Sequence, residues 1–246
     1  MITIDKLMVQ YSDGKQVIHE ISCQIKDGET LGIIGANGAG KSTLLKSLVG
    51  ILLPARGSIK IHEEEVNQKN LRKIREMVGV VFQNSDDQLF MSNVYDDIAF
   101  GPRNLCMDEE IIRQKIDHLL HTLGIEHLEK CHSNRISGGE KKIIAIATAL
   151  IMEPSVILFD EPSSFLDPRM RRRLINLLKE LRITKIIATH DLDLALDLCD
   201  RVILLKDGNI EAEGPANEIL TKKALLEEAG LELPLCFQSR GFNMEI

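Results

Sequence analysis

The sequence contains no tryptophan and few other aromatic residues. Phe and Tyr make up 4% of its 246 residues, as 7 Phe and 2 Tyr. Proteins that bind single-stranded nucleic acid stack several bases on aromatic side chains, so this composition argues against such a platform. Because 44% of the residues are nevertheless hydrophobic, the core must be built mainly from aliphatic side chains.

Paired cysteines and long hydrophobic runs are also missing. The 5 cysteines include no C-x-x-C pair, which favours reduced thiols over a disulfide framework or a zinc site. The longest nearly apolar run, Ile143 to Met152, is shorter than the roughly 18–20 residues that span a bilayer. Residues 1–6 have neither the basic end nor the apolar stretch of a signal peptide. These absences predict a cytoplasmic protein.

Acidic residues outnumber basic ones, with 37 Asp and Glu against 30 Lys and Arg and a formal net charge of −7. This is the wrong sign for a protein whose affinity comes from neutralising nucleic-acid phosphates. The charge therefore predicts that nucleic acid is not a partner.

Short alternating segments over the first thirty residues predict antiparallel strands, with turns at residues 12–14 and 26–28. Residues 30–34 then form a compact apolar strand that runs into glycines, and residues 41–49 have leucines at helical spacing. Glu63–Glu65 is expected to lie in a loop. The order strand, glycine-rich loop, helix is typical of a phosphate-binding site.

Beyond residue 133, predicted helices and strands alternate, which favours a mostly parallel sheet with helices on its faces. The mainly helical section 90–132 is predicted to be a subdomain inserted into one α/β core. We therefore expect a single domain, 1–246, with a core of residues 1–89 and 133–220 and a tail of residues 221–246. The predicted elements are helices 138–150 and 192–198, strands 79–82, 156–159, 185–189 and 202–205, a helix carrying Leu174 to Leu181, and an earlier helix at 108–124.

The strongest motif is a match to G-x-x-x-x-G-K-[ST] at the end of the predicted strand 30–34. Glycines let the backbone turn its N–H groups inward around an anion, and the helix that follows adds a favourable dipole. Its lysine would reach the terminal phosphates and its serine would hold Mg²⁺. The motif comprises Gly35, Ala36, Asn37, Gly38, Ala39, Gly40, Lys41 and Ser42.

Two adjacent carboxylates, Asp160 and Glu161, end the predicted buried strand 156–159. An acid at the carboxyl end of a parallel strand faces the ligand crevice. Asp160 is suited to contact Mg²⁺, and Glu161 is suited to polarise a water for attack on the γ-phosphate. The alternative is a solvated strand end that precedes a loop.

A third motif, Ser137-Gly138-Gly139-Glu140, has two compatible interpretations. S-x-x-E before an apolar run is a capping box, in which Ser137 begins the helix and Glu140 reaches back to it. Two consecutive glycines do not help a cap, but they expose N–H groups as a second phosphate nest does.

Taken in order, the motifs resemble those of the ATP-binding cassette (ABC) ATPases over nearly the whole chain. The matches are Gly35–Ser42 to the Walker A loop, Gln83 to the Q-loop, Ser137–Glu140 to the signature, Asp160–Glu161 to the end of Walker B, Ser164–Asp167 to the D-loop and His190 to the switch histidine. The resemblance implies a P-loop NTPase of the ABC type: a mixed, mostly parallel sheet with an antiparallel N-terminal β subdomain and an inserted helical subdomain.

The resemblance also implies roles in Mg²⁺-dependent ATP hydrolysis. Glu161 would be the general base, His190 would contact the γ-phosphate, and Gln83 would connect Mg²⁺ and the attacking water to the loop that follows. Tyr11 falls where the family stacks an aromatic ring on adenine, although a half-buried strand residue is the alternative. The implied nucleotide contacts are Tyr11, Gly35 to Ser42, Thr43, Ser137, Gly138, Gly139 and Glu140, and the implied metal contacts are Ser42, Gln83 and Asp160.

In such a family the partners are a second ATPase subunit and integral membrane subunits. Two ATP molecules would lie between head-to-tail subunits, each bound by the Walker A loop of one chain and the signature of the other. Membrane subunits would dock near Gln83–Phe90, on a surface that includes Asp86, Asp87, Leu89 and Phe90. The resemblance thus implies a peripheral protein at the cytoplasmic face of the cell membrane.

Residues 81–90, 98–102 and 229–234 are similar to segments of the energy-coupling-factor and cobalt-type importers of prokaryotes. This similarity implies uptake of a transition-metal ion or a vitamin. An efflux-type cassette is one alternative. A soluble cassette acting on ribosomes or DNA is another, although its members usually have two fused cassettes or a long coiled-coil insertion.

Three residues depart from the family pattern. Glu140 stands where Gln is usual, Ile143 where the signature helix usually carries Arg, and Phe165 where the D-loop usually has a small residue. These departures leave open whether the signature supports full hydrolysis at the opposing site.

Overall fold

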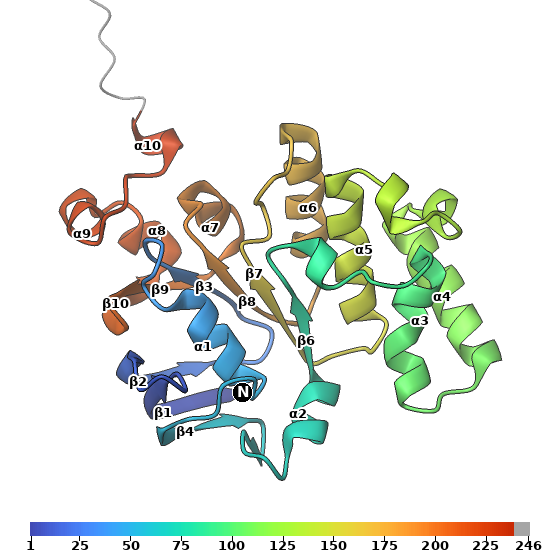
Figure 1. Ribbon diagram of the computed structural model, residues 1–246. Coiled ribbons are helices and arrows are strands. Elements are labelled where there is room, and N and C mark those ends of the chain that lie inside the picture. Colours follow the sequence, from blue (N-terminus) through green and yellow to red (C-terminus); the bar gives the residue numbers. More distant parts are fainter. Residues whose placement is uncertain (239–246) are drawn as a thin grey trace, which may run out of the picture. The chain divides into compact units, whose positions relative to one another are not determined.

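A computed structural model describes residues 1–238 of the chain (Figure 1). It divides into two compact units. The first unit comprises Met1–Arg75 and Arg182–Ile246, and the second comprises Glu76–Leu181. Residues 239–246 of the predicted tail lie outside the described residues.

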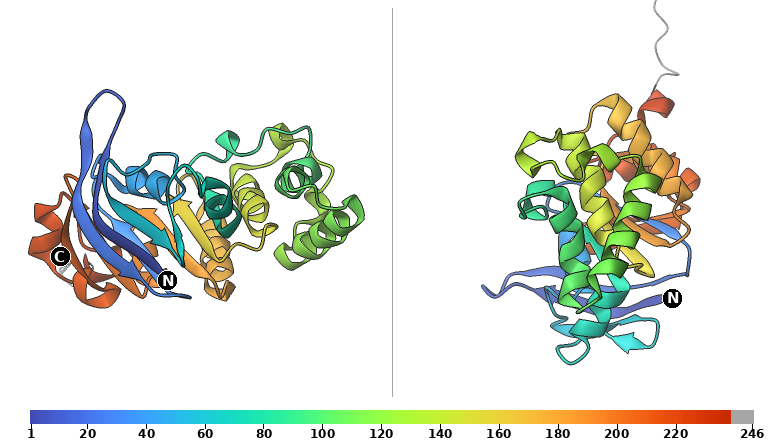
Figure 2. Two further views of the ribbon diagram at one scale, coloured as in Figure 1. Left: turned by 90° about the horizontal axis from the view of Figure 1, so that it is seen from below. Right: turned by 90° about the vertical axis from the view of Figure 1, so that its right-hand side faces the viewer.

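An antiparallel sheet forms one part of the first unit, as predicted for the N-terminal residues. Its order is β2-β1-β4-β5, and alternate side chains of β1 and β2 are buried. β1 and β2 form a long hairpin whose turn projects beyond the sheet (Figure 2). The loop predicted at Glu63–Glu65 is wrong in part, because Glu64 and Glu65 pair with β4. The strands are β1 (Ile2–Gln10), β2 (Gln16–Ile25), β4 (Arg56–Ile61) and β5 (Glu64–Glu65).

The first unit also contains four strands in the order β10-β9-β3-β8. β9, β3 and β8 are parallel, and β10 is antiparallel to β9. Every residue of β3 and β8 is buried, which explains their continuous apolar sequences. The strands are β3 (Thr30–Ile34), β8 (Thr184–Thr189), β9 (Arg201–Lys206) and β10 (Asn209–Pro215).

Helices cover these strands. α1 (Lys41–Leu48) contacts β1, β2 and β8, whereas α7 (Leu192–Leu198) packs on β3 and β8. The helix α8 (Ala216–Ile219) packs on β9 and β10. Two short helices follow, α9 (Lys223–Glu228) and α10 (Leu235–Gln238).

The second unit combines a parallel strand pair with a group of helices. β6 (Val78–Val81) pairs in parallel with β7 (Val156–Asp160), and α5 packs on β6 and on three neighbouring helices. The chain enters this unit through α2 (Leu71–Met77). The helices are α3 (Val94–Asn104), α4 (Glu109–Leu123), α5 (Gly138–Leu150) and α6 (Pro168–Glu180), with 3₁₀ turns at Ser85–Asp87, Glu126–Leu128 and Ser133–Arg135.

Local sequence explains the ends of these helices. Asp108 caps the start of α4, and Gly124 ends it in the left-handed conformation that glycine tolerates. The guanidinium of Arg173, on α6, donates to the carbonyls of Leu123 and Gly124 at this end. A basic side chain at the C-terminus of a helix interacts favourably with the negative end of the helix dipole.

Among the described residues, no helix combines the length and the hydrophobicity needed to cross a membrane.

Candidate functional site

The predicted phosphate site lies at the start of α1. Its N-cap, Gly40, has φ 107° and provides no side-chain cap, and the first turn has no acidic residue. In contrast, side chains cap the starts of α3, α4, α5, α6 and α7. The first N–H groups of α1 are therefore not satisfied by a side-chain cap, as expected where a phosphate supplies the acceptor.

The loop before α1 depends on its glycines for two different reasons. A Cβ on Gly35 would lie 2.4 Å from the carbonyl oxygen of Leu205, so the fold itself requires glycine there. Gly38 has φ 84°, a backbone conformation that glycine adopts without strain. Nothing lies within 4 Å of the position that a Cβ would occupy, so there is open space at the exposed tip beside Asn37. The ammonium of Lys41 donates to the carbonyl of Gly35 at 2.7 Å and to that of Ala36 at 3.2 Å.

Two more predicted residues lie beside this loop. The hydroxyl of Tyr11, at the end of β1, is 3.0 Å from the hydroxyl of Thr43 in α1. His190 follows β8, whose Thr189 is in register with Ile34 at the end of β3. The first unit thus brings Tyr11 to the first turn of α1, and it places His190 after the strand that neighbours the one leading into the loop.

The second unit brings together another set of predicted residues. Val81 and Phe159 are in register in parallel strands, so Gln83, just after β6, and Asp160, the last residue of β7, lie at neighbouring strand ends. Gln83 is exposed, Asp160 is half-buried and Glu161 is buried. Glu161 has φ 46°, an uncommon backbone conformation for a residue with a side chain. Such strain often occurs at functional sites.

The signature combines a helix cap with a glycine pair of which Gly138 is exposed and Gly139 is half-buried. Ser137 and Glu140 form a reciprocal capping box at the start of α5, which confirms the structural interpretation. A Cβ on Gly139 would lie 2.6 Å from Met170, so packing against α6 accounts for that glycine. Nothing in the described structure lies within 4 Å of a Cβ on Gly138, so this chain offers no steric reason for glycine there.

The carboxylate of Glu140 is held as an anion. It accepts hydrogen bonds from the hydroxyl of Ser137 at 2.6 Å and from its backbone N–H at 3.0 Å. The Ser137 hydroxyl is the main reason why the pKa of Glu140 lies below its usual value, although partial burial opposes the shift. His127 lies 3.8 Å from the same carboxylate and lowers this pKa further if it is protonated.

Two residues that the sequence did not single out hold the segment after β6. Lys142 is 2% exposed, and its ammonium donates to the carbonyls of Phe82 and Gln83. Burial lowers the pKa of Lys142 to about 8, and nearby Asp160 opposes the shift. The Gln88 side chain accepts from the N–H of Phe82 and donates to groups on α5. For Lys142, the only signal in the sequence was its position directly before an apolar helical run.

The predicted docking segment divides into buried and exposed residues. Leu89 is buried, so its inclusion in the docking surface is wrong, because its side chain belongs to the core. Phe90 is 62% exposed and meets Phe100 edge-to-face, with ring centroids 5.0 Å apart. The buried carboxylate of Asp97 accepts from the N–H groups of Phe90 and Met91, which fixes the backbone under this aromatic pair.

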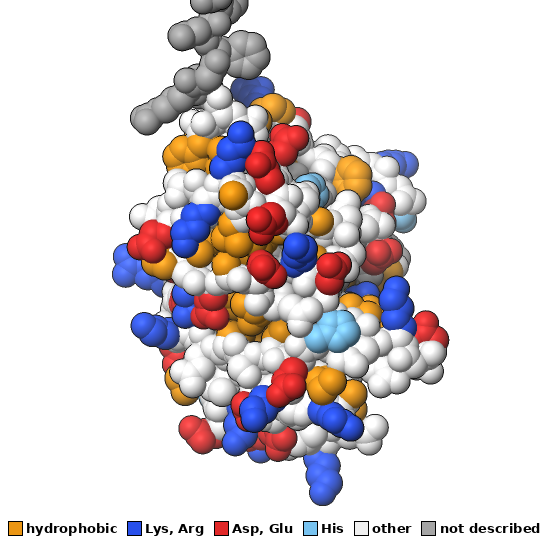
Figure 3. All heavy atoms as spheres, turned by 90° about the vertical axis from the view of Figure 1, so that its left-hand side faces the viewer, with side chains coloured by type: hydrophobic (Ala, Val, Ile, Leu, Met, Phe, Trp, Pro, Cys, Tyr) orange, Lys and Arg blue, Asp and Glu red, His pale blue; other side chains and the backbone are white. Residues whose placement is uncertain are grey.

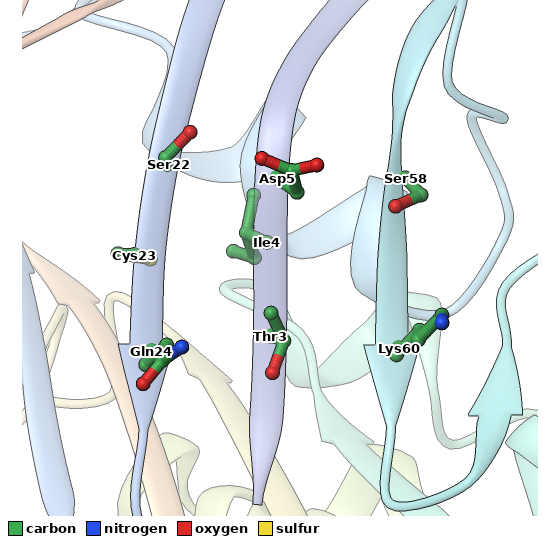
Figure 4. Close-up of a pocket in the computed structure, with 8 residues that line it drawn as sticks. All are labelled: Thr3, Ile4, Asp5, Ser22, Cys23, Gln24, Ser58 and Lys60. Atoms are coloured by element: carbon green, nitrogen blue, oxygen red, sulfur yellow. The ribbon is translucent and has the colours of Figure 1, made fainter.

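A separate hollow of about 460 Å³ lies on the antiparallel sheet of the first unit (Figure 4). Its lining comes from β1, β2 and β4 and is mostly polar, because alternate side chains of these strands face outward. None of the predicted site residues lines it, so it is not the candidate site. The lining residues are Thr3, Ile4, Asp5, Ser22, Cys23, Gln24, Ser58 and Lys60.

The predicted metal contacts have the chemistry that Mg²⁺ prefers. Ser42, Gln83 and Asp160 all offer oxygen atoms, which hard divalent cations select over nitrogen and sulfur. Within residues 1–238, no group of three or more His, Cys, Asp or Glu side chains could hold a metal by itself. Each of these donors by itself therefore suits Mg²⁺, a cation that commonly shares its coordination with substrate phosphates and water.

Comparison with known proteins identifies the family. The family model described as "ABC transporter" matches residues 18–164, which contain the Walker A loop, the signature and the Asp160–Glu161 pair. The chain belongs to the ABC transporter family. It is the ATP-binding subunit of an ABC transporter and hydrolyses ATP to energise transport.

Curated relatives cover almost the whole chain. A putative ABC transporter ATP-binding protein of Geobacter sulfurreducens is 44% identical, over 93% of this chain and 92% of that protein. The energy-coupling factor transporter ATP-binding protein EcfA2 of Clostridium perfringens is 40% identical, over 95% of this chain and 84% of that protein. The ABC transporter subunit is therefore close in sequence to ATPases of the energy-coupling-factor type.

Solved structures confirm the ABC ATPase fold. The structure of cbiO1 from Clostridium perfringens, described as part of the transporter complex cbiONQ, is 39% identical with a TM-score of 0.83 and covers 97% of this chain and 98% of that one. A dimeric structure of the cassette MJ0796 bound to ADP and Pi is 28% identical, with a TM-score of 0.78, and covers 88% of this chain and 99% of that one. The predicted fold class, with its antiparallel N-terminal sheet and mostly parallel strands, is thereby confirmed.

Proposed function

We propose that this ABC ATPase drives uptake of a transition-metal ion or a vitamin as part of an energy-coupling-factor type importer. Support comes from its similarity to EcfA2 and to cbiO1, which is described as part of the cbiONQ complex. The substrate-selecting residues would belong to other polypeptides, so this chain supplies the motor and not the specificity.

In the proposed mechanism, the first unit binds the triphosphate. The uncapped N–H groups of α1 and the ammonium of Lys41 bind its anionic oxygens, and Ser42 contributes a hydroxyl to Mg²⁺. To do so, Lys41 exchanges the loop carbonyls that it now contacts for phosphate oxygens. Tyr11 stacks on adenine, its hydroxyl oriented by Thr43, and His190 contacts the γ-phosphate.

The second unit supplies the hydrolytic groups in this proposal. Asp160 and Gln83 provide oxygens to the metal, and Glu161 accepts a proton from the attacking water. Bound Mg²⁺–ATP contributes the reactive γ-phosphate and the positive charge that stabilises its transfer. Burial of Glu161 keeps its carboxylate away from bulk water at the end of β7.

Each ATP is expected to lie between two subunits arranged head to tail. The observation that carries this proposal is the open space around Gly138, which nothing within the described chain explains. A nucleotide bound to the Walker A loop of a partner, the same chain or a paralogue, would occupy that space against the N-terminus of α5. The dimeric structures of MJ0796 give independent support for pairing of such cassettes.

Membrane subunits are expected to dock on the exposed aromatic pair Phe90 and Phe100, beside the Q-loop. Asp86 and Asp87 are exposed in the same segment; Asp86 pairs with Lys141, and Asp87 can complement a basic coupling helix. This arrangement would hold the ATPase at the cytoplasmic face of the membrane as a peripheral subunit.

Replacing Glu161 by Gln tests the proposed mechanism. Loss of a general base slows turnover by about a hundred- to ten-thousandfold, while the amide leaves ATP binding intact. Glu161→Gln should therefore remain ATP-bound and accumulate as a dimer, measured by light scattering after size-exclusion chromatography with ATP and Mg²⁺. Glu153→Gln, which alters an exposed carboxylate elsewhere in the second unit, is the matched control and should hydrolyse ATP normally.

An unchanged ATPase rate in Glu161→Gln would contradict the assigned base. Copurification of the chain from membranes, followed by identification of the integral subunits, tests the transport assignment. Recovery of ribosomal partners without integral membrane subunits would overturn that assignment.

A further inference from the structure

The segment that carries Gln83 is attached to α5 at three points. Lys142 contacts its beginning, Lys141 contacts its middle, and Gln88 contacts α5 from its end. All of these residues belong to the second unit. Because α5 also begins at the signature Ser137–Glu140, one helix connects the signature to the Q-loop.

Lys142 makes the most unusual of these attachments. Its ammonium donates to the carbonyl of Phe82 at 3.0 Å and to that of Gln83 at 2.7 Å. Lysine is rarely buried without paired acceptors, and here the side chain is 2% exposed. The Lys142 side chain thereby satisfies two backbone carbonyls in the segment directly after β6. These two hydrogen bonds orient the peptide groups on both sides of Gln83.

Gln88 closes the segment at its other end. Its side-chain oxygen accepts from the N–H of Phe82 at 3.1 Å, and its amide nitrogen lies within 3.2 Å of the carbonyls of Val80 and Ala145 and 2.7 Å from the hydroxyl of Thr148. Between these ends, Lys141 lies 2.6 Å from Asp86. The backbone from Phe82 to Gln88 is therefore a closed loop held by side chains of α5.

We propose that Lys142 is a positioning residue, which couples the Q-loop to the signature helix by holding the backbone of Gln83 against α5. The Gln83 side chain is exposed, so nothing buried fixes it except the backbone beneath it. Any shift of α5 when its N-terminus meets a nucleotide would then move Gln83 and the neighbouring docking segment together. The expected effect on hydrolysis rests on the proposed function, whereas the expected effect on the backbone of the loop does not.

Two substitutions separate the donor role of Lys142 from its charge. Lys142→Met keeps the unbranched chain up to the position of the lysine Cε but removes the ammonium, and with it both hydrogen bonds and the charge. Lys142→Gln also removes the charge but retains two N–H donors. Lys115→Met, which removes a half-buried lysine paired with the exposed Glu153, is the control for charge loss in the same unit.

Amide hydrogen exchange of the nucleotide-free chain measures the loop directly. In Lys142→Met, amides of residues 83–88 should exchange at least about fivefold faster, because two hydrogen bonds are lost and a typical one contributes about 1 kcal/mol. Lys142→Gln should show a smaller increase, and Lys115→Met none. Exchange in β3 and α1 of the first unit serves as the internal check that each variant remains folded.

Steady-state hydrolysis then tests the positioning role. Lys142→Met should lower kcat by about ten- to a hundredfold, because a misplacement of about 1 Å has effects of that size, while KM for ATP changes less than about twofold. Lys142→Gln should recover much of kcat. A general loss of stability would instead reduce the active fraction of both variants in proportion to unfolding, which thermal melting detects.

Three results would overturn the inference: unchanged loop exchange in Lys142→Met, a normal kcat in that variant, or equal loss in the Met and Gln variants. The last result would assign the effect to charge and not to the donors. If wild-type protein shows no ATPase activity, the proposed function fails, whereas the exchange experiment still decides whether Lys142 holds the loop.

Discussion

Glu140 has two opposing effects at a single position. As a carboxylate in the first turn of α5 it stabilises the helix start, by about 0.3–1 kcal/mol for a typical exposed site. In the proposed dimer, however, the same negative charge would lie near a triphosphate, and repulsion would weaken closure. In that dimer the residue would favour local stability at the expense of ATP-driven pairing.

Replacing Glu140 by Gln should strengthen ATP-driven dimerisation. Repulsion between two unit charges at 4 Å in a water-like environment is about 1 kcal/mol, so the two sites of a homodimer together correspond to about a thirtyfold change in the dimer dissociation constant. Sedimentation equilibrium of Glu161→Gln, with and without Glu140→Gln, measures this constant with no turnover. Weaker pairing in the double variant would mean that the carboxylate assists the contact.

The stability effect of the same substitution should depend on pH. The folded state lowers the pKa of Glu140, chiefly through the Ser137 hydroxyl, so its contribution is fully present above the unfolded pKa of about 4.3. It is lost as the pH falls through the lower, folded pKa. Urea unfolding should thus show Glu140→Gln as less stable than wild type at neutral pH, with a difference that shrinks in acid.

At the scale of elements, α5 has two glycines with different requirements. Gly139 packs against Met170 of α6, and the Cβ of that methionine would lie 3.0 Å from an added Cβ. Gly138 has open space around it. The two residues are of the same type and adjacent in the sequence, so the different requirement for glycine comes from the neighbour that each one faces in the fold.

Alanine at these two positions should separate stability from activity. Gly139→Ala should lower the free energy of unfolding by about 1–3 kcal/mol through overpacking, or less if Met170 adjusts. Gly138→Ala should leave stability unchanged or raise it by up to about 1 kcal/mol, since alanine favours helices. Denaturant melts measure both.

Gly138→Ala should nevertheless lose most ATPase activity, because a methyl group would enter the space expected for the partner's nucleotide. Full activity in a stable Gly138→Ala protein would be evidence against a nucleotide at this end of α5.

Helix and strand positions were largely predictable from the sequence, because periodicity and capping act over a few residues. The helix at Gly138–Leu150 and the strand at Thr30–Ile34 have the expected bounds. The pairing of Glu64–Glu65 with β4 and the binding of Arg173 to the end of α4 were not expected. The Arg173 contact joins groups that are distant along the chain. The pairing of Glu64–Glu65 is a backbone contact that side-chain patterns do not encode.

At the scale of the whole molecule, several large hydrophobic side chains are exposed among the described residues, including Phe90 and Phe100. On the face shown in Figure 3, acidic and basic side chains are interspersed and neither sign forms an extended area. The aromatic pair Phe90–Phe100 lies instead in the second unit, next to the Q-loop. Exposed aromatic pairs of this kind often mark protein interfaces.

Replacing Phe90 by Ser should weaken assembly with the membrane subunits without impairing the isolated ATPase. The ring is 62% exposed, so its loss removes little of the core, whereas a central aromatic residue of an interface contributes about 2 kcal/mol or more to binding. Copurification with the integral subunits measures assembly. Ile51→Ser, at a comparably exposed site of the first unit, is the control.

Equal copurification of Phe90→Ser and wild type would place the docking surface elsewhere. Loss of ATPase activity in the isolated variant would indicate that Phe90 supports the Q-loop and not a partner.

The sequence by itself determined the family, the phosphate loop and the order of elements. These features reside in short motifs, in which glycines, a lysine and adjacent carboxylates are recognisable without their surroundings. Only the tertiary structure decided that Lys142 is buried, that Leu89 belongs to the core beside an exposed Phe90, and that Tyr11 contacts Thr43. Burial depends on which distant residues come together, so neighbouring residues of the same type can have opposite environments. The scarcity of aromatic residues has a structural counterpart: an aliphatic core, with one tyrosine beside the phosphate loop and a phenylalanine pair at the surface.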